Sequence, residues 1–101
     1  MSGWPPIGGF ALLVVLAGTV AATAAEAPPP GASSCSGCHA TSAAVETPVP
    51  RLVGRAAAQI VAAMHEFRSG QRPATVMDRI AKGFSDPEVT AIGDWYARQR
   101  P

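Results

Sequence analysis

Two stretches of the chain place apolar side chains at the spacing of a helix. Residues 55–69 contain no Pro and no Gly, and their apolar positions recur every three or four residues, so they predict an amphipathic helix that ends at Gly70. The positions on its apolar face are Ala57, Ile60, Val61, Met64 and Phe67. A second apolar stripe, near the end of the chain, consists of Val89, Ile92 and Tyr96.

The second stripe follows a strong helix-start signal. The run Ser85-Asp86-Pro87-Glu88 places Ser at the N-cap, Pro just inside the helix and Glu at its third position. Arg98 and Arg100 lie where the negative end of the helix dipole favours cations, so the helix is expected to end near residues 98–100. Between the two stripes, residues 77–81 predict a short helical turn that Gly83 stops.

The remaining pattern favours loops and one further helix. Residues 41–54 contain Pro48 and Pro50 and predict a loop, and no stretch alternates as a strand does. Residues 33–39 predict a helical turn that Ser33 or Ser34 would cap. The predicted fold class is therefore all-α, with three main helices plus a short one.

The first 25 residues differ from the rest because they carry no charged side chain. An apolar run over residues 7–17 is followed by small residues, as in a secretory signal, and cleavage is expected after Ala24 or Ala25. This divides the chain into a signal peptide (1–24), a Pro-rich lead-in (25–32) and a main domain (33–101). An uncleaved membrane anchor is the alternative, but both interpretations export the main domain and give it no other contact with a membrane.

Charge and size limit what the exported part can do. All eight Lys and Arg and all seven Asp and Glu lie at or after Glu26, without a dense basic run, which argues against nucleic-acid binding. So small a domain rarely buries enough apolar surface to be stable alone, and we expect a cofactor or cross-link to stabilise it.

The motif that carries chemistry is Cys35-Ser36-Gly37-Cys38-His39, which has the C-x-x-C-H pattern of c-type haem attachment. Two thiols three residues apart lie on one side of a helical turn, where each can add to one haem vinyl group. His39 would then ligate the iron. A redox dithiol, a zinc site and a plain disulfide are the alternatives. The first lacks a βαβ setting, the second lacks further ligands, and the third leaves His39 without a role. Covalent haem attachment in bacteria takes place outside the cytoplasmic membrane, which agrees with export to the periplasm.

The candidates for a second axial ligand are Met64, His65 and Met77. Met64 lies in an apolar stripe and is interpreted as core, and His65 lies at the polar edge of that stripe. Met77 follows an irregular Pro-containing segment and is expected to be the ligand. His/Met ligation leaves no open position and suits electron transfer rather than oxygen chemistry or gas sensing.

Other residues are expected around the iron ligands. A backbone carbonyl in the 41–54 loop, with Pro50 the choice, is expected to accept the second ring N–H of His39. Arg51 and Arg55 either pair with haem propionates or are solvated loop charges.

The domain resembles the small monohaem cytochromes c of the c-553 and c4 type, and more narrowly the cytochrome subunit of flavocytochrome c sulfide dehydrogenase. The resemblance rests on the runs Phe67-Arg68-Ser69-Gly70-Gln71-Arg72-Pro73-Ala74-Thr75-Val76-Met77 and Ile80-Ala81-Lys82-Gly83-Phe84-Ser85-Asp86, and on Val49-Pro50-Arg51-Leu52-Val53-Gly54. It implies the cytochrome c fold around one covalent haem c. It also implies that Met77 is the axial ligand and that the Pro50 carbonyl supports His39.

The resemblance also implies a partner. In that family an FAD-containing flavoprotein subunit oxidises sulfide, and electrons pass through the haem subunit to a soluble cytochrome acceptor. This chain has no nucleotide-binding glycine motif, so it is expected to be the haem subunit and not itself the enzyme. The alternative is a free-standing electron carrier to an oxidase or photosynthetic reaction centre.

Overall fold

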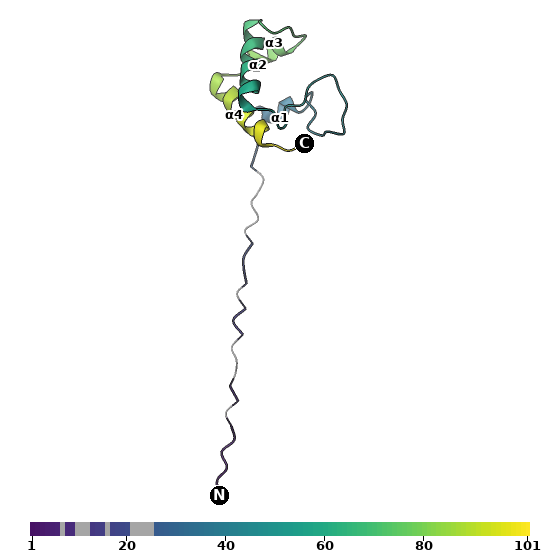
Figure 1. The fold of residues 1–101 in the computed structure, drawn as a ribbon. Helices are drawn as coiled ribbons and strands as arrows, with labels where there is room; N and C mark the ends of the chain where they lie inside the picture. The colour runs from purple at the N-terminus through teal and green to yellow at the C-terminus, as the bar shows by residue number, and fades with distance from the viewer. Residues whose placement is uncertain (7, 10–12, 16, 21–25) are drawn as a thin grey trace.

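The computed structural model describes residues 1–6, 8–9, 13–15, 17–20 and 26–101. Their secondary structure consists of helices alone, as the all-α prediction requires: α1 (Ala32–Cys35), α2 (Ala57–Ser69), α3 (Met77–Ala81) and α4 (Asp86–Arg98) (Figure 1). No helix in this part of the chain is both long and apolar enough to span a bilayer. The predicted cleavage positions at Ala24 and Ala25 lie outside the described residues.

The ends of the long helices follow the predicted local signals. Helix α2 ends at Gly70, whose φ of 80° is in the left-handed region. At the start of α4 the Ser85 hydroxyl accepts the Glu88 backbone N–H (3.4 Å), and the Glu88 carboxylate accepts the Ser85 backbone N–H (2.7 Å). The capping box, the end of α2, the limits of α3 and the start of α4 are therefore confirmed, whereas α2 begins at Ala57, two residues later than predicted.

Helix α1 corrects the sequence prediction. It has four residues, its N-cap is Gly31 at φ 85°, and neither Ser33 nor Ser34 caps it. The Ser34 hydroxyl instead donates to the Gly31 carbonyl (2.6 Å). An added Cβ on Gly31 would lie 2.6 Å from the Phe84 ring, so this tight turn admits only glycine. The described residues therefore contain two long and two short helices, instead of three main helices and a short one.

Helix α2 packs against both α3 and α4. Helix α4 approaches α2 at Gly93, where a Cβ would lie 3.2 Å from Val61 Cγ2 and 3.3 Å from the Ala57 carbonyl oxygen. The absence of a side chain at Gly93 thus allows the two helix backbones to come close.

The buried apolar side chains of the described residues are few: Ala32, Ile60, Ala81, Val89, Ile92 and Tyr96. Cys35 packs against this core and is half-buried. The Tyr96 hydroxyl donates to the Ala32 carbonyl (2.5 Å), and the Tyr96 carbonyl accepts the Gly54 N–H (3.0 Å). One residue of α4 therefore fixes both the start of α1 and the end of the 41–54 loop.

The lead-in lies along the last turns of α4. The Glu26 carboxylate pairs with Arg98 (3.0 Å), and the Trp95 indole N–H donates to the Glu26 carbonyl (3.4 Å). These contacts bring the lead-in to the end of α4 that also carries Tyr96.

Candidate haem-binding site

The C-x-x-C-H residues form one turn at the end of α1. The backbone N–H groups of Cys38 and His39 both donate to the Cys35 carbonyl, at 3.2 and 2.9 Å. Both cysteines are free thiols, with Cys35 half-buried and Cys38 exposed. Burial raises the pKa of the Cys35 thiol, because desolvation disfavours the thiolate. The turn therefore presents two thiols and an imidazole within five consecutive residues.

The His39 ring contacts the 41–54 loop. Its Nδ1 lies 2.5 Å from the Pro50 carbonyl oxygen. A carbonyl oxygen can only accept, so Nδ1 carries the proton and Nε2 keeps its lone pair. In this tautomer the ring is oriented by one nitrogen and can ligate a metal through the other.

The loop itself is held by short-range contacts. The backbone N–H groups of Ala44 and Val49 donate to the hydroxyls of Ser42 and Thr47, each at 3.2 Å. The Arg51 guanidinium donates to the Ala43 carbonyl (3.3 Å). These bonds join residues close in the sequence, so they do not fix where the loop lies relative to the helices. The position of the loop is set by its two ends and by its contact with His39.

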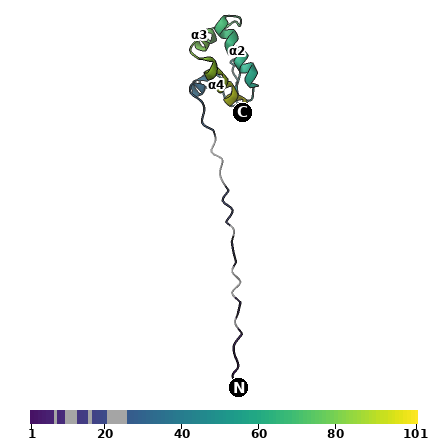
Figure 2. The same ribbon diagram turned by 90° about the vertical axis from the view of Figure 1, so that its left-hand side faces the viewer.

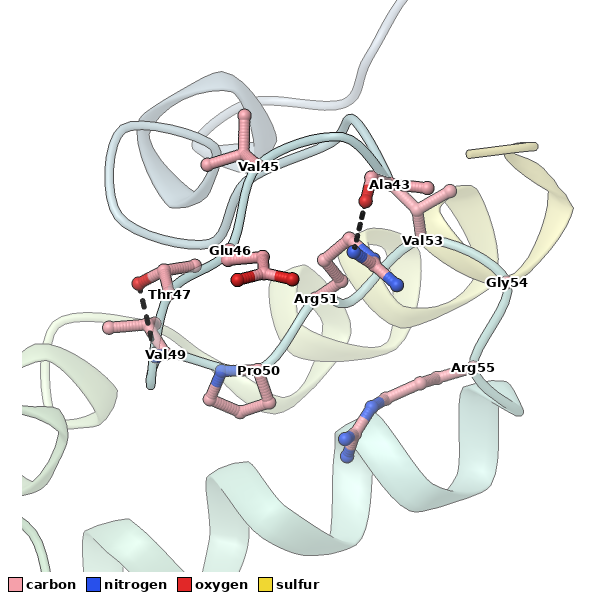
Figure 3. Close-up of a pocket in the computed structure, with 10 residues that line it drawn as sticks. All are labelled: Ala43, Val45, Glu46, Thr47, Val49, Pro50, Arg51, Val53, Gly54 and Arg55. Carbon is pink, nitrogen blue, oxygen red and sulfur yellow. Dashed lines mark hydrogen bonds between the residues drawn. The ribbon is translucent and has the colours of Figure 1, made fainter.

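The loop borders a hollow of about 630 Å³, into which Arg51 projects from the loop and Arg55 from just before α2 (Figure 3). The lining includes Pro50 but neither cysteine nor Met77. The residues predicted to attach the haem and to ligate its iron therefore do not themselves line this hollow. Arg51 and Arg55 are exposed, as both of the roles considered for them allow.

Met77 is the first residue of α3 and is half-buried. Helices α1 and α3 lie on the same side of α2, at different heights (Figures 1 and 2). The other candidates come from α2: Met64 is half-buried, and the His65 side chain is 48% exposed with Nε2 3.4 Å from Asp86 Oδ1.

The uncovered apolar surface fits a porphyrin. Within residues 26–101 the large apolar side chains that remain exposed are Val45, Val76 and Ile80, at 48%, 50% and 40%. Two of them flank Met77, and an apolar ring ligated there would remove such side chains from water. In the described residues no three His, Cys, Asp or Glu side chains gather as a metal-ion cluster. The thiols, imidazole and thioether are the donor types that bind haem c.

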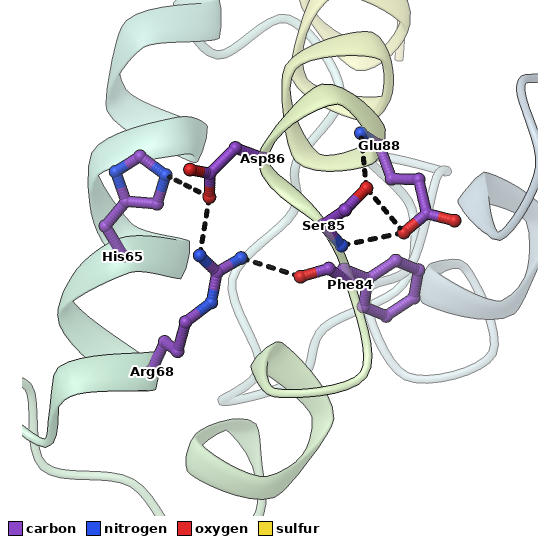
Figure 4. A network of polar contacts seen from close by, with 6 residues as sticks. All are labelled: His65, Arg68, Phe84, Ser85, Asp86 and Glu88. Carbon is purple, nitrogen blue, oxygen red and sulfur yellow. Dashed lines mark hydrogen bonds and ion pairs between the residues drawn. The ribbon is translucent and has the colours of Figure 1, made fainter.

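A polar network that the sequence analysis did not anticipate lies beside α3 (Figure 4). The Arg68 guanidinium donates to Asp86 Oδ1 (2.5 Å) and to the Phe84 carbonyl (2.7 Å). Hydrogen bonding and charge from Arg68 hold the pKa of Asp86 below its ordinary value. An Arg at this position had no partner at helical spacing, so the sequence alone carried no signal for it.

Comparison with known proteins assigns the chain to a family. No protein-family model matches it. It is 35% identical over 63 residues to the cytochrome subunit of sulfide dehydrogenase of Chlorobaculum tepidum, covering 62% of this chain and 57% of that protein. It is 32% identical to the thiosulfate dehydrogenase electron acceptor of Thiomonas intermedia, covering 74% of this chain and 36% of that protein.

A third relative is matched over most of its length. The chain is 31% identical over 70 residues to cytochrome c-554(548) of Halomonas halodenitrificans, covering 65% of this chain and 84% of that protein. This match extends well beyond the C-x-x-C-H motif, and the motif supplies the two cysteines that covalent haem requires. The chain therefore belongs to the small cytochromes c, electron-transfer proteins whose cofactor is haem c.

Proposed function

We propose that this cytochrome is the haem subunit of a sulfide-oxidising flavocytochrome c. It accepts electrons from an FAD-containing subunit and passes them to a soluble cytochrome acceptor in the periplasm. The observation that carries the proposal is the 35% identity to the cytochrome subunit of sulfide dehydrogenase. Sulfide oxidation would take place in the flavoprotein, so this chain is an electron-transfer subunit and not itself the enzyme.

In this proposal the site residues have separate roles. Cys35 and Cys38 attach the haem, and His39 and Met77 are the axial ligands. The Pro50 carbonyl holds the His39 ring through Nδ1, which supports the role given to it (2.5 Å). Haem c supplies a one-electron couple, and two protein ligands leave no position for a substrate. The residues of the chain thus hold the ligands fixed and keep water from the iron.

A free-standing electron carrier is the second candidate. The observation that favours it is the match to cytochrome c-554(548), which covers 84% of the length of that protein. The name of that protein mentions no enzyme. The match to the sulfide dehydrogenase subunit covers 57% of that protein. The two candidates share the site and differ in the partner.

The test is to purify the full chain from the periplasm of its source bacterium through a tag after Pro101. The proposal expects a red protein that copurifies with a flavoprotein, and haem that sulfide reduces within the complex. The control is the same cytochrome separated from the flavoprotein, which sulfide should reduce much more slowly. A cytochrome that elutes alone, without flavin and without rapid reduction by sulfide, would contradict the proposal and support the free carrier.

A further inference from the structure

Helix α3 has little to stabilise it on its own. It has five residues, and its N-cap, Val76, makes no side-chain cap. Asp78 Oδ1 is buried without a hydrogen-bond partner in the described structure. A helix this short is not stable in isolation, so the position of Met77 depends on what holds the two ends of α3.

Arg68 holds the connection that follows α3. It projects from the last turns of α2, its side chain is 31% exposed, and its guanidinium contacts two groups of the α3–α4 junction. One nitrogen donates to the Phe84 carbonyl (2.7 Å) and the other to the Asp86 carboxylate (2.5 Å). The planar guanidinium can satisfy both acceptors at once, which a lysine ammonium cannot do with the same geometry.

Phe84 extends this link to the haem-attachment turn. Its carbonyl accepts from Arg68, and its ring packs beside Gly31, the N-cap of α1. The junction after α3 is therefore held between α2 and the segment that leads to Cys35. A shift of this junction would move α3 relative to the attachment turn.

We propose that Arg68 is a positioning residue for the methionine side of the haem. It fixes the α3–α4 junction and thereby keeps Met77 in reach of the iron. The inference rests on the proposed role of Met77 as axial ligand. The charge of Arg68 is not the essential property. The essential property is the planar guanidinium, whose two nitrogens donate to the Phe84 carbonyl and to the Asp86 carboxylate at the same time.

The positioning role of Arg68 can be measured with an added ligand that competes with Met77 for the iron. An added ligand binds the iron only when Met77 leaves, so its apparent affinity rises as the bond to Met77 weakens. Removing a charge-assisted contact of this kind is expected to tighten the binding of added imidazole about tenfold, corresponding to about 1.4 kcal/mol. The probe is imidazole titrated into the oxidised, haem-loaded protein and followed by its visible spectrum.

Four single variants and one double variant make the measurement specific. Arg68→Ala is expected to bind imidazole about tenfold more tightly, and Arg68→Lys to fall between it and the natural protein. The matched control is Arg72→Ala, which should bind imidazole as the natural protein does. In the described residues Arg72 pairs with Glu66 (2.7 Å) and stacks on Phe67, and neither contact reaches the α3–α4 junction. Met77→Ala is expected to bind imidazole most tightly, and adding Arg68→Ala to it should change nothing further.

The outcomes separate this inference from the proposed ligation. If Met77→Ala binds imidazole as weakly as the natural protein, Met77 is not the ligand and the proposed function of the site fails. If Met77→Ala opens the iron but Arg68→Ala does not, only the role of Arg68 is wrong. An equal effect of Arg68→Ala with and without Met77 would likewise overturn it, because a general loss of stability would act in both backgrounds.

Discussion

Residues 57–98 and residues 31–56 reach their structures in different ways. The first region packs two long helices at Gly93, begins α4 with a capping box and adds the Arg68 pair. The second contains a four-residue helix and a long loop, and its longer-range contacts are few, chiefly those of Tyr96 and His39. The region with the fewest contacts of its own carries the C-x-x-C-H motif. The proposed haem would attach to this second region, so haem binding is expected to affect it more than the helical region.

The largest effect is expected from Cys38→Ala, which removes one of the two proposed covalent links to the haem. The attachment region should loosen while the helices of residues 57–98 remain. Where the haem is lost, the stabilisation that its binding gives to the folded state is lost as well. The measurements are haem content after denaturing extraction and the melting temperature.

The control for this variant is Ser36→Ala, between the two cysteines. The Ser36 side chain is exposed and its hydroxyl donates to the Ser33 carbonyl (2.8 Å), so haem content should be unchanged. Full haem content and natural stability in Cys38→Ala would show that the attachment region does not depend on the second thioether.

A smaller effect is expected from Gly93→Ala, which disturbs the helical region instead. The added methyl group would meet Val61 and the Ala57 carbonyl oxygen, and the backbone of α2 cannot yield as a side chain can. Overpacking costs about 1–3 kcal/mol, against which the better helix propensity of Ala returns up to about 1 kcal/mol. Urea unfolding should therefore show a net loss of stability.

Thr90→Ala, on the exposed side of the same helix, is the control and should change stability little. A gain of stability in Gly93→Ala would mean that the two helices are not in close contact at this point. Haem content should stay full in both variants, in contrast to Cys38→Ala.

The smallest effect is expected from Asp86→Asn, which changes how the stability of the protein depends on pH. Its lowered pKa, due first to the hydrogen bond and then to the charge of Arg68, means that the unfolded chain binds this proton more readily. The stabilising contribution is present above the ordinary carboxyl pKa, about 3.9, and is lost as the pH falls through the lowered value. In the natural protein the unfolding midpoint should fall as the pH drops below about 4, and in Asp86→Asn this fall should be smaller.

The matched control is Asp94→Asn, which changes an exposed carboxylate of the same helix that has no ion pair in the described structure. Its acid dependence should follow that of the natural protein. An Asp86→Asn profile identical to the natural one would remove the evidence that the Arg68 pair stabilises the helical region.

Local signals predicted the helical region well. The caps at Gly70 and Ser85 act within a few residues, so they can be recognised in the sequence, and so can the short turn at 77–81. The motif and the family were also recognisable, because they depend on residue type and spacing.

Apart from the contact of His39 with the Pro50 carbonyl, contacts between distant segments were not predicted. The start of α1 at Ala32 depends on the Phe84 ring beside Gly31. The two hydrogen bonds of Arg68 depend on the path of the α3–α4 junction. Neither contact produces a periodic pattern in the sequence. Ser33 and Ser34 were therefore wrongly assigned as helix caps, and no role was predicted for Arg68. The buried hydroxyl of Tyr96 offered one usable signal, since a tyrosine in an apolar stripe needs a partner for its proton.

The two bonds of Tyr96 have a consequence for the order of maturation. This residue of α4 closes the segment between Ala32 and Gly54 into a ring, although it follows that entire segment in the chain. In synthesis from the N-terminus the C-x-x-C-H motif is made well before Tyr96, so the ring cannot close until nearly the whole chain is available. Until then these two bonds cannot hold the ends of the segment together, and the packing of α4 is what brings them into contact.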